Sequence, residues 1–204
     1  MTLADPERDV LDWGVLLLLA CLPFRNASER DLADVQVTGA YIGPGMAPAP
    51  GSSKGQSWDG FDIPAEVFQA LAELAAQGVP LPSEVGEVLA QFAEYLSYPD
   101  PYGQVEINRG DDYASAIELD PEDRNAFSVD WVEAPVYRDV DLLDDERLRV
   151  TLWDHDILNE DDMIGLAVLN NEDIAEARDA QEIHSVWVGD QTEYQLLFIR
   201  VEAW

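Results

Sequence analysis

Hydrophobic and polar positions alternate along most of the chain beyond residue 32. The alternation is clearest in residues 147–153, where Leu148, Val150 and Leu152 are each followed by Arg149, Thr151 or Trp153. A period of two is typical of a half-buried strand. Eight segments rich in β-branched and aromatic residues predict strands: residues 35–42, 103–107, 115–119, 127–132, 147–153, 163–169, 185–188 and 194–203. Eight short strands separated by turn signals predict a mainly β fold, an antiparallel β-sandwich.

One segment, residues 62–97, has helical rather than strand spacing. The apolar positions of its two runs are Ile63, Val67, Phe68, Leu71 and Leu74, then Val85, Val88, Leu89, Phe92 and Leu96. Gly78 and Pro80 break the pattern between the runs, and Asp62 and Ser83 are the expected N-caps. The segment therefore predicts an αα-hairpin inserted into the β domain.

The strand at residues 147–153 runs into an acidic loop that contains Asp154, Asp156 and Asp162. In extended backbone Asp154 and Asp156 point the same way, and a turn through Asn159 brings Asp162 back towards them. Calcium takes six to eight oxygen ligands, and carboxylates supply both the oxygens and the neutralising charge. The loop therefore predicts a calcium site, with a solvated turn on an acidic protein as the alternative.

An EF-hand loop beginning at Asp154 is excluded by its spacing. That motif needs an oxygen ligand at the position of Leu158, glycine at that of Asn159 and glutamate at that of Gly165.

Two motifs in this sequence resemble those of the C2 domain family. The Trp-Asp-His-Asp run at residues 153–156, followed after five residues by Asp162 and then by Ile164-Gly165, is similar to the third calcium-binding loop of that family. Asp100-Pro101-Tyr102, which precedes a predicted strand, is similar to the family's Asp-Pro-Tyr signature.

The resemblance implies an eight-stranded, antiparallel C2-like sandwich of type II topology over residues 32–204, with residues 62–97 inserted in its first calcium-binding loop. It also implies a set of calcium ligands: Asp100, Asp154, Asp156 and Asp162, with Asp59 from the first loop. Asp62 is a rival to Asp59, because the helical segment separates both of them from the Asp-Pro-Tyr motif.

The charge balance narrows the choice of partners. The chain has 42 acidic and 11 basic residues, a net charge of -31, and Lys54 is its only lysine. Nucleic acid is therefore excluded as a partner, because phosphate binding requires clustered Lys and Arg. Weak or no binding to anionic membranes is expected for the same reason, which leaves calcium itself and a protein partner. Acidity alone also fits a merely highly soluble surface.

The sequence does not suggest an enzyme. Only His155 and His184 could act as general bases near neutral pH, and no serine lies in a Gly-x-Ser-x-Gly elbow. The expected function is that of a non-catalytic, calcium-binding C2-type module that mediates calcium-dependent interaction or stabilises an exported protein. The alternatives are a calcium-independent C2-like structural or interaction domain, and an enzyme with its active site between the helical segment and the calcium loops.

The first 31 residues carry a separate signal. Residues 15–22 are the most apolar stretch of the chain, too short to span a membrane, and Leu18-Leu19-Ala20-Cys21 resembles a bacterial lipobox. The acidic residues before it oppose this interpretation, because an export signal has a positive first region. Residues 1–31 therefore predict either an export signal and tether, with Cys21 acylated in the cell envelope, or a short helix on a cytoplasmic protein.

Overall fold

The computed structural model describes residues 30–48, 52, 54–58, 60–108, 113–119, 127–131, 134, 136–143, 147–155 and 161–204, with backbone alone at 113–119. The chain divides into two units, Met1–Arg30 and Asp31–Trp204, and every helix and strand of the described residues belongs to the second. The lipobox with Cys21 and the predicted ligands Asp59 and Asp156 lie outside the described residues. Within those residues, no helix is both long and apolar enough to cross a membrane.

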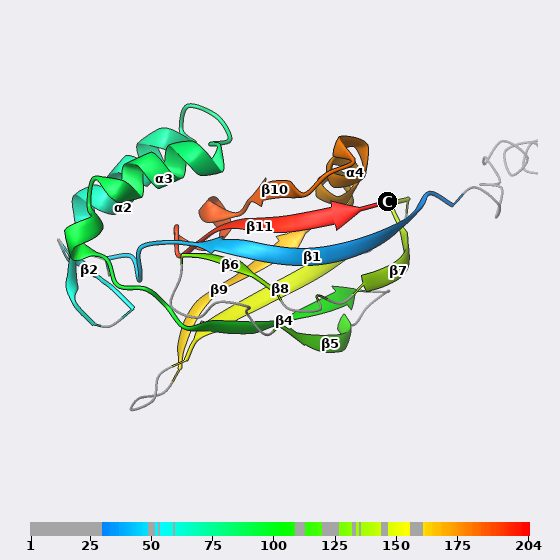
Figure 1. Ribbon diagram of the computed structural model, residues 1–204, viewed down its shortest axis with the longest axis horizontal. Coiled ribbons are helices and arrows are strands. Elements are labelled where there is room, and N and C mark those ends of the chain that lie inside the picture. Colours follow the sequence, from blue (N-terminus) through cyan, green and yellow to red (C-terminus); the bar gives the residue numbers. More distant parts are fainter. Residues whose placement is uncertain are drawn as a thin grey trace, which may run out of the picture. The chain divides into compact units, whose positions relative to one another are not determined.

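Two antiparallel sheets form the body of this unit, which confirms the predicted mainly β sandwich (Figure 1). The first sheet has the order β10 (His184–Trp187), β11 (Leu196–Ala203), β1 (Leu32–Ile42) and β6 (Ser128–Asp130), with β7 (Val136–Asp141) also paired to β1. The second has the order β5 (Tyr113–Leu119), β4 (Pro101–Asn108), β8 (Arg147–Asp154) and β9 (Asp162–Leu169).

Both β6 and β7 pair with the same edge of β1. β6 contacts residues 39–41 of β1, and β7 contacts residues 32–36. The two short strands follow one another along a single edge and together take the place of one strand. In the described part of the chain, each sheet is therefore four strands wide.

The hydrophobic core lies between the two sheets. Buried and more exposed positions alternate along β1 and β4, as the sequence pattern predicts. The inward side chains include Val35 and Val37 from one sheet and Val105 and Val150 from the other, all with no exposed surface. Burying an aliphatic side chain of this size contributes about 1.5–3 kcal/mol, so this alternation fixes which face of each strand points inward.

Strand β7 was not among the predicted strands. Its two buried residues, Tyr137 and Val140, are three positions apart, because Asp139 between them has a left-handed backbone (φ 56°). This irregularity removes the period of two on which the prediction depended.

The helix α4 (Asn171–Ala180) was also not predicted. Only Ile174 and Ala177 are buried in it, which is too short an apolar stripe to stand out in an acidic segment. The missed signal is its N-terminal cap: the Asn170 side chain accepts hydrogen bonds from the backbone N–H groups of Glu172 and Asp173.

Helices α2 (Ala65–Ala75) and α3 (Pro82–Ala90) lie in the segment of helical spacing, followed by the short 3₁₀ helix η2 (Ala93–Tyr95) (Figure 1). Leu71 and Val85 pack with Leu197 and Phe198 of β11, so the helices cover the outer face of the first sheet.

The two expected N-caps of this segment are wrong. Asp62 belongs to β3 (Asp62–Pro64), which pairs with β2 (Lys54–Gln56), and the cap of α2 is Pro64. Ser83 lies inside α3, which begins one residue earlier because Pro82 occupies its first turn.

One hydrogen bond joins the two sheets through the core. The Tyr137 hydroxyl of β7 donates to the Val105 carbonyl oxygen of β4 at 2.7 Å, and the Tyr137 residue is 6% exposed. Burial, together with the negative charge of Glu106, raises the pKa of Tyr137 to about 12. The hydroxyl therefore stays protonated and donating at neutral pH.

We expect Tyr137→Phe to lower the free energy of unfolding by about 0.5–1.5 kcal/mol, because it removes one buried hydrogen bond and keeps the ring. Urea denaturation followed by tryptophan fluorescence measures the change. Tyr98→Phe is the control, since Tyr98 is 60% exposed. Equal stability of the two variants would contradict the inter-sheet role of Tyr137.

Candidate calcium site

The two motifs quoted from the sequence lie side by side at one end of the second sheet. β4 and β8 pair antiparallel, with Pro101 opposite Asp154 and Tyr102 opposite Trp153. β8 and β9 then pair with Asp154 opposite Asp162. The start of β4, the end of β8 and the start of β9 therefore meet, and they carry Asp100, Asp154 and Asp162 to the same end.

Asp154 is the buried carboxylate of this end, with 4% of the residue exposed. Its Oδ1 accepts a hydrogen bond from the backbone N–H of Asp100 at 2.5 Å. In return, the Asp100 carbonyl accepts one from the backbone N–H of His155 at 2.9 Å. A buried carboxylate is costly unless it is hydrogen-bonded, so these contacts fix Asp154 against the Asp-Pro-Tyr motif.

The chemistry of the donor set fits calcium. Asp100 and Asp162 are half-buried beside the buried Asp154, and carboxylate oxygens are the ligands that this hard cation takes. Among the described residues, however, no group of three or more His, Cys, Asp or Glu side chains converges as a metal site. Since Asp59 and Asp156 lie outside those residues, coordination of calcium by the five aspartates stays a prediction.

The contacts of Asp62, the alternative to Asp59, lie in a different hairpin. Its carboxylate forms an ion pair with the ammonium group of Lys54 across the β2–β3 pair. The Asp62 side chain is 69% exposed. The described contacts thus give Asp62 a partner of opposite charge and give no support to its role as a calcium ligand.

An aromatic cluster that the sequence analysis missed borders the same end. Tyr102 stacks on Trp153 with ring centroids 5.6 Å apart, and it meets the ring of His155 edge-on at 6.2 Å. The Tyr102 hydroxyl donates to Asp161 Oδ2 at 2.6 Å, and His155 Nδ1 lies 3.1 Å from Asp161 Oδ1. The available signal was that each of the two motifs contributes one aromatic residue beside its aspartate.

The contact with Asp161 changes the acidity of Tyr102. The hydrogen bond to the carboxylate, assisted by burial and by the negative charge of Asp161, raises the pKa of Tyr102 to about 12. The cluster ties β4, β8 and the residue that precedes β9 together beside the aspartates.

When the chain is compared with family models, curated proteins and solved structures, the matches are to solved structures. No family model matches the chain, and no curated protein matches its sequence. The C2 domain labelled A of a plant Extended Synaptotagmin 1 is 11% identical, with a TM-score of 0.43 over 84% of this chain and 91% of that domain.

Two further solved structures resemble the chain. Human GIVD cytosolic phospholipase A2 is 10% identical, with a TM-score of 0.43 over 85% of this chain and 17% of the phospholipase. The C2 domain labelled A of RIM from Drosophila is 15% identical, with a TM-score of 0.31 over 69% of this chain and 87% of that domain. What the strand pairing itself defines is the class: an antiparallel β-sandwich with an acidic end.

We expect Asp161→Asn to lower the pKa of Tyr102 from about 12 towards the ordinary value of 10.0, because it removes the charged hydrogen-bond acceptor. The folded pKa is raised, so the stabilisation from this contact is complete below pH 10 and is lost as the pH rises from 10 to 12. Phenolate absorbance, taken as the difference between each protein and its Tyr102→Phe derivative, reports the titration. Asp179→Asn on α4 is the control; if both variants titrate alike, Asp161 is not the partner of Tyr102.

Proposed function

We propose that this chain is a non-catalytic, calcium-binding module of the C2 type. The ligands are Asp100, Asp154, Asp156 and Asp162, completed by Asp59. The observation that carries the proposal is the strand register, which sets Pro101 and Asp162 opposite Asp154 and so assembles both sequence motifs at one end of one sheet.

Electrostatics supports a cation at this end. Asp100, Asp154 and Asp162 bring three carboxylates to neighbouring strand ends in a protein of net charge -31. A cation bound among these like charges relieves their mutual repulsion. Calcium fits better than magnesium, which demands near-ideal octahedral geometry and releases its water reluctantly.

The strand order also supports the C2-type assignment. β1 is the first described strand and β11 the last, and they pair antiparallel in the middle of the first sheet. The helices α2 and α3 fall between β1 and the Asp-Pro-Tyr motif, which is where the resemblance locates the first calcium-binding loop.

Bound calcium serves either to order the loops or to engage a protein partner. The location in the cell envelope, with Cys21 as the acylation site, belongs to the same proposal and rests on the sequence of the first 31 residues alone.

A calcium-independent C2-like interaction domain is the second candidate. One observation favours it: Asp154 accepts a hydrogen bond from the Asp100 backbone, and the rings of Tyr102, Trp153 and His155 pack against one another at the same end.

We expect calcium to raise the melting temperature by roughly 5–10 °C at 100 times its dissociation constant, since such a ligand adds about 2.7 kcal/mol to the folded state. Magnesium should give a much smaller shift. Asp154→Asn combined with Asp156→Asn should abolish the calcium shift, and the asparagine oxygen at residue 154 can still accept from Asp100.

The matched control for this experiment removes the same two charges elsewhere. Asp179→Asn with Glu182→Gln changes exposed residues at the end of α4 and beyond it, so the full calcium shift should remain. Differential scanning fluorimetry with calcium and with a chelator gives the readout. A calcium shift that survives in the Asp154/Asp156 variant would show that the site is elsewhere.

We expect calcium binding without strong attachment to anionic vesicles. Each basic residue contributes about 1 kcal/mol near such a surface, and this chain has 11 of them against 42 acidic residues. Sedimentation with phosphatidylserine vesicles at about 0.15 M salt is the measurement, with neutral phosphatidylcholine vesicles as the control. Tight pelleting that requires both calcium and phosphatidylserine would overturn this ranking of partners.

A further inference from the structure

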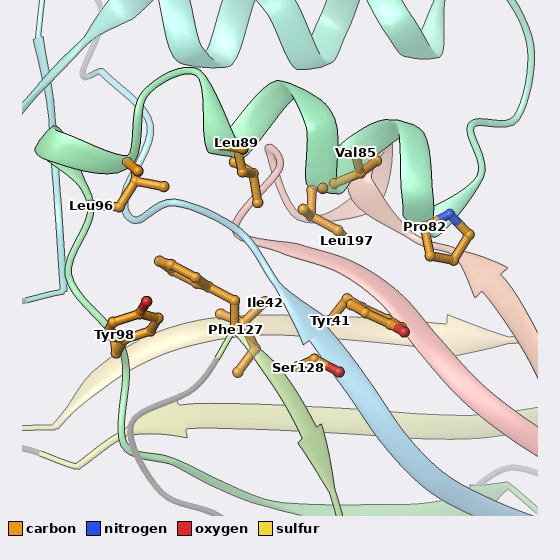
Figure 2. A pocket seen from close by; sticks show the side chains of 13 residues that line it. Tyr41, Ile42, Pro82, Val85, Leu89, Leu96, Tyr98, Phe127, Ser128 and Leu197 are labelled. Carbon is orange, nitrogen blue, oxygen red and sulfur yellow. The ribbon is translucent and has the colours of Figure 1, made fainter.

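An apolar pocket lies between helix α3 and the outer face of the first sheet. Its volume is about 310 Å³, at the lower end of the range for small-molecule sites. Figure 2 shows Val85 and Leu89 of α3 pointing towards Tyr41 and Ile42 of β1, with Phe127 beside them. No charged side chain is among the described residues that line it. The pocket therefore suits an uncharged, apolar ligand group.

A second hollow of about 600 Å³ adjoins the first, because Leu96 and Tyr98 line both. Its lining combines three exposed aromatic residues with two carboxylates: Phe61, Tyr95 and Tyr98, with Asp62 and Glu94. Lys54 is the ion-pair partner of Asp62, whereas Glu94 is hydrogen-bonded to Tyr95, which raises the pKa of Tyr95. No basic residue lines the hollow among the described residues.

One hollow is apolar, and the adjacent one is lined by aromatic rings and carboxylates. Together they match a ligand with an apolar chain and a cationic head. Aromatic faces attract an ammonium group within about 6 Å, and carboxylates strengthen that attraction. The net charge of -31 also concentrates cations near the surface and repels anions. A fatty acid or an acidic lipid is thus disfavoured at the same place where a cationic head is favoured.

The geometry points to a binding site for a single-chain amphiphile with a cationic head. The alkyl chain occupies the apolar pocket between α3 and β1, and the ammonium group lies against Tyr95, Tyr98 and Glu94. Its residues come from α3, η2, β1 and the neighbouring segments, and none of them is among the proposed calcium ligands. Calcium is therefore not part of this site, although Phe61 and Tyr98 each lie two residues from a proposed ligand, Asp59 and Asp100.

Calorimetry with decyltrimethylammonium chloride, kept below its micelle concentration, tests the site on the full chain. Affinity should rise about fourfold for each methylene added from hexyl to decyl, which corresponds to ~0.8 kcal/mol per buried methylene. Decyl sulfate should bind at least tenfold more weakly, and tetramethylammonium, which has no chain, should not bind measurably. The titration is carried out with a chelator present, because calcium at Asp59 and Asp100 would lie two residues from Phe61 and Tyr98.

Two pairs of variants separate the site from general attraction to an acidic surface. Gly86 lines the apolar pocket, and a Cβ added there meets no atom within 4 Å. Gly86→Leu should fill the pocket and weaken binding at least tenfold, whereas Ser83→Leu, exposed on the same helix, should not. Glu94→Gln should weaken binding severalfold, and Glu87→Gln, which removes the same charge outside both hollows, should have no effect.

Circular dichroism of each variant confirms that the fold is retained. Equal affinity of Gly86→Leu and Ser83→Leu, or an affinity that does not increase with chain length, would overturn the proposal and leave only surface adsorption. Equal or tighter binding of decyl sulfate would overturn the assignment of a cationic head.

Discussion

The register of β4 against β8 is the constraint on which the acidic end depends. It sets Asp154 opposite Pro101 and Trp153 opposite Tyr102, and β9 continues the same alignment with Asp162. A slip of one residue would turn every side chain of β8 to the opposite face. Asp154 would then lose the Asp100 N–H, and Trp153 would leave the ring of Tyr102.

Contacts in the hydrophobic core, away from the acidic end, stabilise this register. Val105 of β4 and Val150 of β8 are opposite one another and fully buried, so a slip of β8 by one residue would turn Val150 away from the core. Tyr137 adds a directional contact from the other sheet to the Val105 carbonyl. The sandwich thus positions carboxylates at its edge through apolar contacts in its interior, while the strong negative charge of the surface disfavours their proximity.

The sequence predicted the parts of this structure that depend on regular patterns. Alternation located β1, β4, β8 and β9, and helical spacing located α2 and α3. It failed where the pattern is interrupted or short, because β7 contains the left-handed Asp139 and α4 buries only two side chains. The helix caps were missed because Asp62 pairs in a hairpin and Pro82 begins α3.

The same division holds for the candidate site. The spacing of the acidic loop identified Asp154, Asp156 and Asp162, and the resemblance added Asp100 and Asp59. The register brings Asp100, Asp154 and Asp162 to one end, whereas Asp59 and Asp156 lie outside the described residues. Asp161 was missed because its hydrogen bond to Tyr102 joins residues 59 positions apart, which local spacing does not reveal.

The stack of Tyr102 on Trp153 beside the aspartates permits a direct measurement of the central claim. Terbium substitutes for calcium at oxygen sites and emits when a nearby tryptophan is excited. A calcium site at this end predicts sensitised terbium emission that calcium displaces and magnesium does not, and that falls sharply when Trp153→Phe is combined with Trp58→Phe, the tryptophan beside Asp59. Emission that is unchanged in this double variant, or absent in the unaltered protein, would contradict a calcium site at the meeting of β4, β8 and β9.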